Sequence, residues 1–329
     1  MKKNILTYLF FLTWMASQAQ DPQFTQFYAN PLYLNPAFTG TSTQGRFVLA
    51  SRIQWASVPG AFQTYSASYD QFFPDIKSGF GLNIYYDRAG TGGLSTTNAR
   101  LLYAYEIKIN RNLFIRPAAE IGYVIRALDF NKLTFGDQLH TDNPSSGEII
   151  SNQAVQFADI GGGVLLYAPN YWVGIAVHHL NMPNESFMNE ESRIPMKFSV
   201  HGGYRFKIDG KNKLDRDYIF IATHYKSQGQ FDQLDIGAYY EHNSLTLGVW
   251  YRGLPVAYSE TAGIGRDAVA ILVGFTQTNL SFAYSYDITI SKLGLNTGGS
   301  HELTVTYEWS NRKNRRFTRR KRVVPCAKF

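Results

Sequence analysis

Residues 79–87 of this 329-residue chain read GFGLNIYYD, and the pattern of this stretch decides the fold. In an extended strand, successive side chains point to opposite faces. One face would then carry Phe80, Leu82, Ile84 and Tyr86, and the other would carry Gly81, Asn83, Tyr85 and Asp87. The stretch therefore predicts a strand with one apolar and one more polar face.

The same alternation recurs along the chain between residues 45 and 309. We predict fourteen strands, at 45–56, 62–72, 79–87, 95–107, 113–127, 156–167, 171–180, 195–207, 218–226, 231–241, 245–252, 267–276, 280–287 and 300–309. An even number of antiparallel strands can close into a barrel, which leaves no strand edge exposed.

The connections between these strands alternate in length. Short connections follow the second, fourth, sixth, tenth and twelfth strands, whereas the long ones include 128–155, 181–194, 253–266 and 288–299. The connection KIDGKNKLDRD, after the eighth strand, is the exception in the short series. Outer-membrane barrels join their strands by short periplasmic turns and longer external loops. The sequence therefore predicts an all-β protein, a 14-stranded antiparallel transmembrane β-barrel of the cell outer membrane, with both termini in the periplasm.

A soluble secreted β-sandwich would show the same alternation, with its apolar faces turned inward. Two features favour the membrane barrel. The polar faces combine charges such as Arg116 and Glu120 with small residues such as Gly161 and Gly163, as a packed or water-filled lumen does. Aromatic residues also gather at predicted strand ends, where membrane barrels carry interfacial girdles. Examples are Tyr69, Phe72, Tyr167 and Tyr307.

The N-terminus predicts export. Two lysines precede an apolar run from Ile5 to about Ala16, and Ser17 and Ala19 supply the small residues of a cleavage site. This pattern is typical of a secretory signal peptide; a buried N-terminal helix is the alternative. We therefore divide the chain into a signal peptide (1–19), a periplasmic N-terminal segment (20–44), a transmembrane barrel (45–309) and a basic periplasmic C-terminal tail (310–329).

The net charge of +7 comes from the tail. The last nineteen residues contain nine Lys or Arg and no acidic residue, so the rest of the chain has a net charge of −2. We predict that the tail binds a periplasmic partner through Arg315, Arg316, Arg319, Arg320, Lys321, Arg322, Pro325, Cys326 and Phe329. Its cations would also attract the anionic head groups of outer-membrane lipid. Export makes nucleic acid an improbable partner, despite the basic run.

No catalytic, cofactor or metal site follows from the sequence. His178 and His179 are neighbours, so in a strand they would point to opposite faces and could not bind one ion together. We expect structural hydrogen bonds from them instead. The chain has no G-x-S-x-G or H-E-x-x-H pattern, and Cys326 lies in a tail with no scaffold to hold a histidine beside it. We therefore expect a protein that is not an enzyme.

Charged residues on the predicted inner faces allow two interpretations of the lumen. These residues are Asp70, Arg100, Arg116, Glu120 and Arg126. They would line an open pore, or they would neutralise one another inside a filled barrel. We favour the filled barrel, although a barrel of this size can be open or filled.

Several long stretches resemble the PorP/SprF family of type IX secretion system outer-membrane proteins. They are QDPQFTQFYANPLYLNPAFTG (20–40), VGIAVHHLNMPNESF (173–187), LGVWYRG (247–253), YSYDITISKLGLNTGGSHELTVTY (284–307) and RRKRVVPCAKF (319–329). Their order along the chain matches the family, and together they cover nearly all of the exported part. One position departs from the family's ending, because Ala327 stands where a second proline is expected.

The resemblance implies an outer-membrane barrel of a Bacteroidota-type organism. It further implies an accessory component of the type IX secretion and gliding machinery. Such a protein would engage or anchor a secreted surface adhesin outside and contact machinery components in the periplasm. The alternative function is a channel for a small solute, similar to fatty-acid transporters. The state of the lumen, open or filled, separates these two functions, and the identity of the adhesin stays open.

Overall fold

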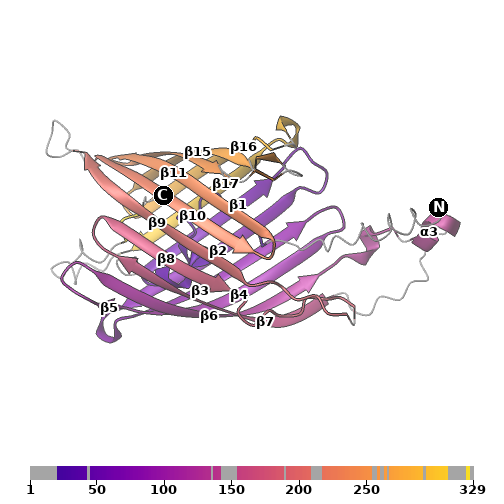
Figure 1. Cartoon of the computed structure of the whole chain (residues 1–329), viewed down its shortest axis with the longest axis horizontal. Coiled ribbons are helices and arrows are strands. Elements are labelled where there is room, and N and C mark those ends of the chain that lie inside the picture. Colours follow the sequence, from indigo (N-terminus) through magenta and orange to yellow (C-terminus); the bar gives the residue numbers. More distant parts are fainter. Residues whose placement is uncertain are drawn as a thin grey trace.

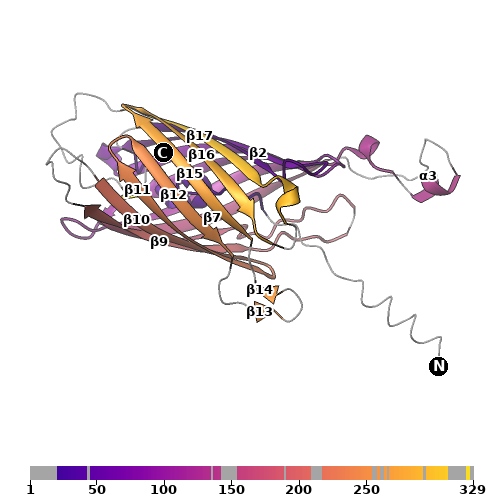
Figure 2. The same ribbon diagram turned by 90° about the horizontal axis from the view of Figure 1, so that it is seen from above.

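The computed structural model describes residues 21–42, 45–134, 136–141, 154–188, 190–208, 217–253, 258–259, 263–264, 267–291, 294–309 and 324–326. Fourteen long strands dominate these residues and form one closed antiparallel barrel (Figures 1 and 2). The predicted fold class is confirmed. None of the helices in the described ranges has the length and hydropathy that a membrane crossing requires.

Neighbouring barrel strands pair in the order in which they occur in the chain. They are β1 (Gly45–Gln54), β2 (Phe62–Phe73), β3 (Ser78–Ala89), β4 (Leu94–Tyr105), β6 (Phe114–Ala127), β7 (Ala154–Tyr167), β8 (Tyr171–His178), β9 (Lys197–Ile208), β10 (Asp217–Gln228), β11 (Phe231–His242), β12 (Leu245–Arg252), β15 (Ala268–Gln277), β16 (Leu280–Thr289) and β17 (Ser300–Trp309). The barrel closes where β1 pairs with β17, from Gly45 opposite Trp309 to Gln54 opposite Ser300.

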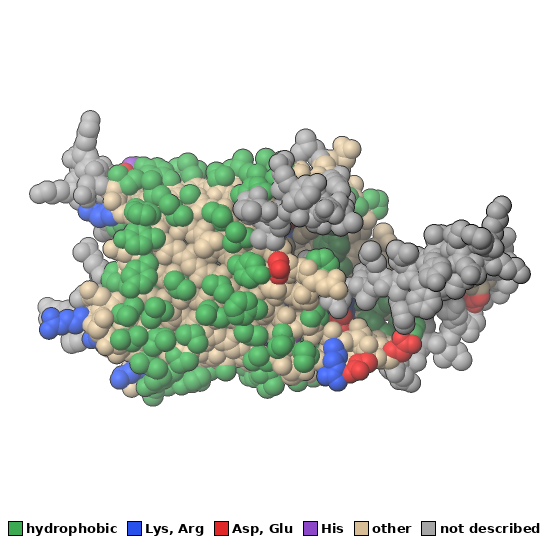
Figure 3. All heavy atoms as spheres, viewed as in Figure 1, with side chains coloured by type: hydrophobic (Ala, Val, Ile, Leu, Met, Phe, Trp, Pro, Cys, Tyr) green, Lys and Arg blue, Asp and Glu red, His purple; other side chains and the backbone are tan. Residues whose placement is uncertain are grey.

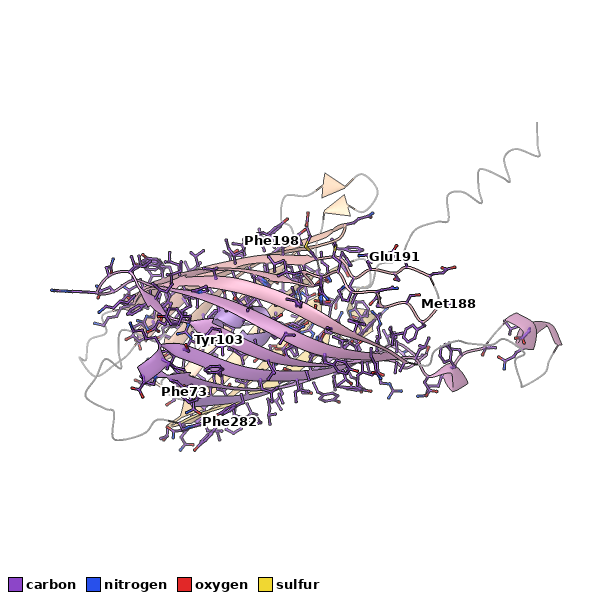
Figure 4. All side chains as sticks on the ribbon, turned by 90° about the horizontal axis from the view of Figure 1, so that it is seen from below. Phe73, Tyr103, Met188, Glu191, Phe198 and Phe282 are labelled. Atoms are coloured by element: carbon purple, nitrogen blue, oxygen red, sulfur yellow. The ribbon has the colours of Figure 1, made fainter. Side chains whose placement is uncertain are left out.

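The apolar face of each strand points out of the barrel. On β3, Phe80, Leu82 and Ile84 are 47%, 38% and 42% exposed, whereas Asn83 between them is fully buried. Figure 3 shows apolar side chains over the barrel wall, with most charged ones near its two ends. In Figure 4, Tyr103, Phe198 and Phe282 lie on the strands β4, β9 and β16, and all three are exposed. A soluble sandwich would bury these side chains, so the structure excludes that alternative.

The strand ends define two rims. The short-turn rim includes the connections 74–77, 106–113, 168–170, 243–244 and 278–279, together with the start of β1 and the end of β17. The long-loop rim includes 55–61, 90–93, 128–153, 179–196, 229–230, 253–267 and 290–299. Short elements decorate the rims: η2 (Pro74–Ile76), β5 (Ile107–Lys108), η3 (Phe130–Lys132), α3 (Gly136–Thr141), β13 (Tyr258–Ser259), β14 (Gly263–Ile264) and η4 (Leu295–Thr297). Figure 2 shows α3, β13 and β14 beyond the strand ends on the long-loop side.

The segment before β1 corrects one expectation. We expected residues 20–44 to lie outside the barrel, yet the described part, 21–42, is almost entirely buried inside the lumen. It contains α2 (Pro31–Leu34) and η1 (Pro36–Phe38), and we call residues 21–42 the plug. The two prolines begin short helices rather than strands, because a proline lacks the N–H that a sheet needs. The segment that fills the barrel therefore precedes the first wall strand in the sequence.

The aromatic residues at the strand ends are divided between the two faces. Tyr69 and Tyr307 are exposed beside Trp309, with ring centroids 5.7 and 5.9 Å from the tryptophan ring, as a girdle requires. Phe72 and Tyr167 are buried and do not face lipid. The girdle prediction was wrong for these two residues, because proximity to a strand end does not decide which face a side chain takes.

A cation on the lipid-facing wall should destabilise the barrel according to its depth. Leu101 lies in the interior of β4 and is 63% exposed, so Leu101→Arg should lower the free energy of unfolding by about 2–4 kcal/mol. Leu245→Arg, at the first position of β12, should cost only about 0–1 kcal/mol, because an arginine at the rim reaches water. Urea unfolding in lipid vesicles measures both, and equal losses would contradict the membrane-spanning assignment.

Candidate functional site: the filled lumen

The plug is attached to the long-loop rim by Asp21. Its carboxylate lies 3.0 Å from His179 Nε2 and 3.0 Å from Lys197 Nζ. The other ring nitrogen of His179, Nδ1, lies 2.9 Å from Asp159 on β7. Gln228, at the end of β10, exchanges two hydrogen bonds of 3.3 Å with Asp21. We call Asp21, His179, Asp159 and Lys197 the rim latch.

The rim latch keeps its charges despite burial. Burial alone would lower the pKa of His179, but the neighbouring carboxylates of Asp21 and Asp159 raise it to about 9. Burial would raise the pKa of Asp21, but His179 and Lys197 hold it well below its usual range. An ionised aspartate and a protonated histidine therefore face each other at neutral pH, and their charge-assisted hydrogen bonds are stronger than neutral ones.

A buried cluster of two arginines and two carboxylates surrounds Thr25. Arg52 lies 2.9 Å from Asp287 and 3.2 Å from Glu302, and Arg252 lies 3.1 Å from Asp287. The backbone N–H of Thr25 donates to Glu302 at 2.7 Å, and its hydroxyl donates to Asp287 at 2.6 Å. The formal charges balance, and the plug supplies donors to both carboxylates. A buried ion pair is better tolerated when further hydrogen bonds reach its carboxylates, as those from Thr25 do here.

The middle of the plug is held by Asn35. Its amide nitrogen lies 3.1 Å from His201 Nε2 on β9 and donates to the carbonyl of Ile175 at 3.1 Å. Its Oδ1 accepts from the backbone of Ala37 at 2.8 Å. The wall facing Asn35 is Gly163 on β7, where a Cβ would collide with the Asn35 amide. Glycine is needed here because the plug touches the backbone of the wall.

The last part of the plug contacts charges near the short-turn rim. Arg116 on β6 donates to the carbonyls of Ala37 and Thr39, and it pairs with Glu106 at 3.1 Å. Asp70 on β2 accepts from the backbone N–H of Gly40 at 2.7 Å and pairs with Arg46 at 2.9 Å. The plug thus takes part in the hydrogen bonding of the wall from one rim to the other.

The luminal charges predicted from the sequence are neutralised inside a filled barrel, as we favoured, but only Arg100 and Glu120 pair with each other. Arg100 lies 3.6 Å from Glu120, and Arg126 pairs with Glu185 from the 179–196 connection. Asp70 and Arg116 have the partners described above. Arg116 and Glu120, which share one strand face, do not pair with each other. Arg116 pairs with Glu106, whereas Glu120 contacts Arg100 and His178. A shared strand face brought Arg116 and Glu120 near each other but did not select the pairs.

The two adjacent histidines both face the interior. His178 Nδ1 lies 2.6 Å from Glu120, and His179 belongs to the rim latch. We expected opposite faces, which holds only within a strand. β8 ends at His178, and His179 has a left-handed backbone with φ of 57°, which turns its side chain inward. The expected hydrogen bonds are present, and the described residues contain no group of three or more His, Cys, Asp or Glu placed to hold a metal ion.

A cavity of about 370 Å³ lies on the long-loop side of the plug. Asp21, Pro22 and Gln23 of the plug line part of it. Its walls combine aromatic and charged side chains, among them Trp55, Phe62, Tyr85, Asp87 and Arg126. This cavity is a vestibule on the long-loop side of the barrel and contacts the plug.

The C-terminal tail reaches the lumen as well. Val324 and Pro325 are buried and Cys326 is partly buried, and Val324 belongs to the same hydrophobic cluster as Phe27 and Tyr28 of the plug. Of the nine tail residues predicted to bind a partner, only Pro325 and Cys326 are described. The others lie outside the described residues: Arg315, Arg316, Arg319, Arg320, Lys321, Arg322 and Phe329. Partner binding by the tail stays a prediction.

The sequence predicted the charges of the wall but missed the residues of the plug that bind them. Thr25, Gln26 and Asn35 are polar residues in an aromatic stretch without strand periodicity, and they look like loop residues. One signal was available. A stretch with this many aromatic and proline residues, FTQFYANPLYLNPAF, needs an apolar environment, which a segment in open periplasm would not provide.

The sequence matches one known protein family. The sequence profile of the family described as type IX secretion system membrane protein PorP/SprF matches residues 16–307. No curated protein matches the chain. Similar solved structures include Omp33 of Acinetobacter baumannii, with 10% identity and a TM-score of 0.45 over 82% of this chain and all of Omp33.

Two further similar structures are described as transport proteins. The monoaromatic hydrocarbon channel CymD has 11% identity and a TM-score of 0.45, over 86% of this chain and 93% of CymD. The toluene transporter TodX of P. putida has 11% identity and a TM-score of 0.45, over 84% of this chain and 93% of TodX. Similarities this distant carry no argument about what passes through or binds to the present barrel.

Enlarging Gly163 should displace the plug. In Gly163→Val the new side chain would occupy the position of the Asn35 amide, so residues 21–42 should become susceptible to protease while the barrel still forms. Gly162→Val is the matched control, because Gly162 is next in sequence and its Cβ would meet only the Ala118 carbonyl, at 3.3 Å. Limited proteolysis in detergent followed by mass spectrometry measures the effect. Equal protection of the plug in both variants would contradict its close packing on β7.

The rim latch should weaken at alkaline pH. Because the pKa of His179 is raised to about 9, its charge contribution is complete below the usual histidine pKa of 6.5 and is lost as the pH rises through about 9. Hydrogen-exchange protection of residues 21–28, corrected for intrinsic rates, should therefore be constant below about pH 6.5 and fall progressively between about pH 6.5 and 9. His179→Gln should lower the protection at pH 7 and abolish the alkaline fall. An unchanged pH profile in this variant would rule out the latch as its origin.

Proposed function

Because the chain belongs to the PorP/SprF family of type IX secretion system membrane proteins, we propose that it acts as a closed outer-membrane adaptor rather than as a conduit. Membership of the family makes the protein a component of that secretion system, located in the outer membrane. The adaptor would bind a secreted surface adhesin on one side of the membrane and machinery components on the other. The filled lumen is the observation that carries this proposal.

The lumen offers little support for the alternative of a small-solute channel. The plug contacts wall strands from the long-loop rim, at Asp21, to the region near the short-turn rim, at Gly40. Moving it would break the hydrogen bonds that Thr25 donates to the carboxylates of Asp287 and Glu302. A hydrogen bond to a charged group contributes about 1.5–3 kcal/mol to stability. A closed adaptor requires no movement of the plug, whereas a channel would have to break these hydrogen bonds, so the adaptor is the better-supported function.

The long-loop rim is the surface that we assign to the adhesin. Long connections of outer-membrane barrels face the outside of the cell. This rim carries the largest connections of the chain and the vestibule beside the plug. Met188 and Glu191 lie at its edge, where Figure 4 shows them beyond the strand ends, and both are exposed. A folded partner could reach these loops without entering the barrel.

The basic run between residues 312 and 322 is the part of the chain that we assign to periplasmic partners. It contains eight Lys or Arg and no acidic residue. Such a run attracts an acidic protein surface and anionic lipid head groups, the latter by about 1 kcal/mol per cation near a membrane surface. Residues 21–42 are buried in the lumen and are not free for this role. We therefore assign the periplasmic contacts to the basic run and not to the N-terminal segment.

Reversing the charge of the run should separate the two partner sets. We expect the combined change of Arg319, Arg320, Lys321 and Arg322 to Glu to abolish recovery of periplasmic components from detergent-solubilised membranes. Recovery of the surface adhesin should persist, because the loops are unchanged. Quantitative mass spectrometry of tagged, purified protein measures both sets.

The matched control keeps the charge and changes only the side chains. Arg319, Arg320 and Arg322 are replaced together by Lys, which should preserve at least most of the recovery if net charge governs the contact. Recovery of neither partner set with the unchanged protein would defeat the adaptor proposal. A steady solute-permeable conductance of the unchanged protein in planar bilayers would favour the channel instead.

A further inference from the structure

The inner wall of the barrel carries an apolar patch among polar side chains. On β10, β11, β12 and β15 this buried patch is formed by Phe220, Ala222, Tyr239, Trp250, Ala270 and Leu272. We call this patch the tail slot. An apolar patch inside a lumen needs a cover, because exposing it to water is unfavourable in proportion to its area.

Two segments that are not part of the wall belong to the same hydrophobic cluster as the tail slot. The first is the plug, since Phe27 lies 4.7 Å from Trp250, measured between ring centroids. The second is the C-terminal tail. Val324 is 3% exposed and belongs to the same hydrophobic cluster as the slot, and Cys326 packs against that cluster.

The tail occupies the half of the lumen nearest the short-turn rim. Cys326 lies close enough to act electrostatically on Tyr28 of the plug, on Arg46 and on Tyr239. Arg46 is the second residue of β1, at the short-turn rim, and Tyr239 lies in the half of β11 that ends there. The rim latch holds the plug at the opposite rim, so the tail and the latch lie near opposite ends of the lumen.

We propose that the tail slot is a binding site for an apolar peptide and that the chain's own segment Val324–Cys326 is its resident ligand. The slot supplies apolar contacts to Val324, and proline suits such a site because its fixed backbone loses little freedom on binding. The tail thereby acts as a removable closure that braces the plug. This inference concerns the barrel alone and does not require any secretion partner.

Covalent attachment to the barrel keeps Val324–Cys326 near the tail slot, so the segment occupies the slot although its intrinsic affinity is low. Val324 follows the last strand residue, Trp309, by fifteen positions, which can span up to about 50 Å when extended. A ligand on a linker of this kind experiences an effective concentration in the millimolar range. A segment with an intrinsic dissociation constant of about 100 μM would therefore occupy its slot most of the time.

Competition with a free peptide tests the inference. The probe is a fluorescent peptide with the sequence of residues 323–329, VVPCAKF, kept reduced and titrated against detergent-solubilised protein. A chain lacking residues 324–329 should bind it saturably, because its slot is vacant. The unchanged chain should bind at least about tenfold more weakly, because its own tail competes. A probe with Asp in place of the second valine should not bind to either chain.

Two point variants keep the test decisive if the truncated chain fails to fold. Val324→Asp should leave the slot vacant in the full chain and restore probe binding, whereas Val324→Ile should keep the tail seated and the probe excluded. Folding of each variant is checked by the heat-dependent gel mobility of the barrel. Absence of saturable binding to folded chains with a vacant slot would overturn the inference, as would equal binding to the unchanged and truncated chains. Either result would leave the adaptor proposal standing.

Discussion

The hydrogen bonds between Thr25 and the carboxylates of Asp287 and Glu302 are the contact on which the rest of the structure depends. Arg52 on β1 and Glu302 on β17 are cross-strand neighbours at the seam where the barrel closes. The same pair contacts the plug, because Glu302 accepts hydrogen bonds from the backbone of Thr25 and Gln26. Closure of the wall and seating of the plug therefore share one set of charges. Closure and seating stabilise each other, because Arg52 on β1 and Thr25 on the plug donate to the same two carboxylates.

This sharing also explains why the lumen is charged yet closed. Water in an open pore would solvate Arg52 and Arg252, but a filled lumen must replace that water with hydrogen bonds. The plug does so with short polar side chains and with backbone N–H groups, which are free to donate because residues 21–42 form no strand. The tail slot is an apolar patch in the same lumen. Aromatic residues of the plug and Val324 of the tail belong to the same hydrophobic cluster as this patch and shield it from water.

The sequence predicted the wall well and the interior poorly. Fourteen strands were predictable because lipid imposes a period of two on each of them, and GFGLNIYYD shows that period within nine residues. The luminal charges were predictable for the same reason. The plug was not, because nothing local distinguishes a polar residue such as Asn35 from one in a solvated loop. The inward turn of His179 was missed because it depends on where β8 ends.

By itself, the sequence determined the fold class, the number of strands, the face that meets lipid and the family. These properties follow from local patterns, because each membrane strand must place apolar side chains on its lipid-facing side. Only the tertiary structure decided that residues 21–42 lie inside the barrel, that Arg116 pairs with Glu106 and that Val324 is buried in the same cluster as the plug. These features join residues from strands far apart in the chain. Their selection depends on distances across a closed barrel, and a linear pattern contains no such distances.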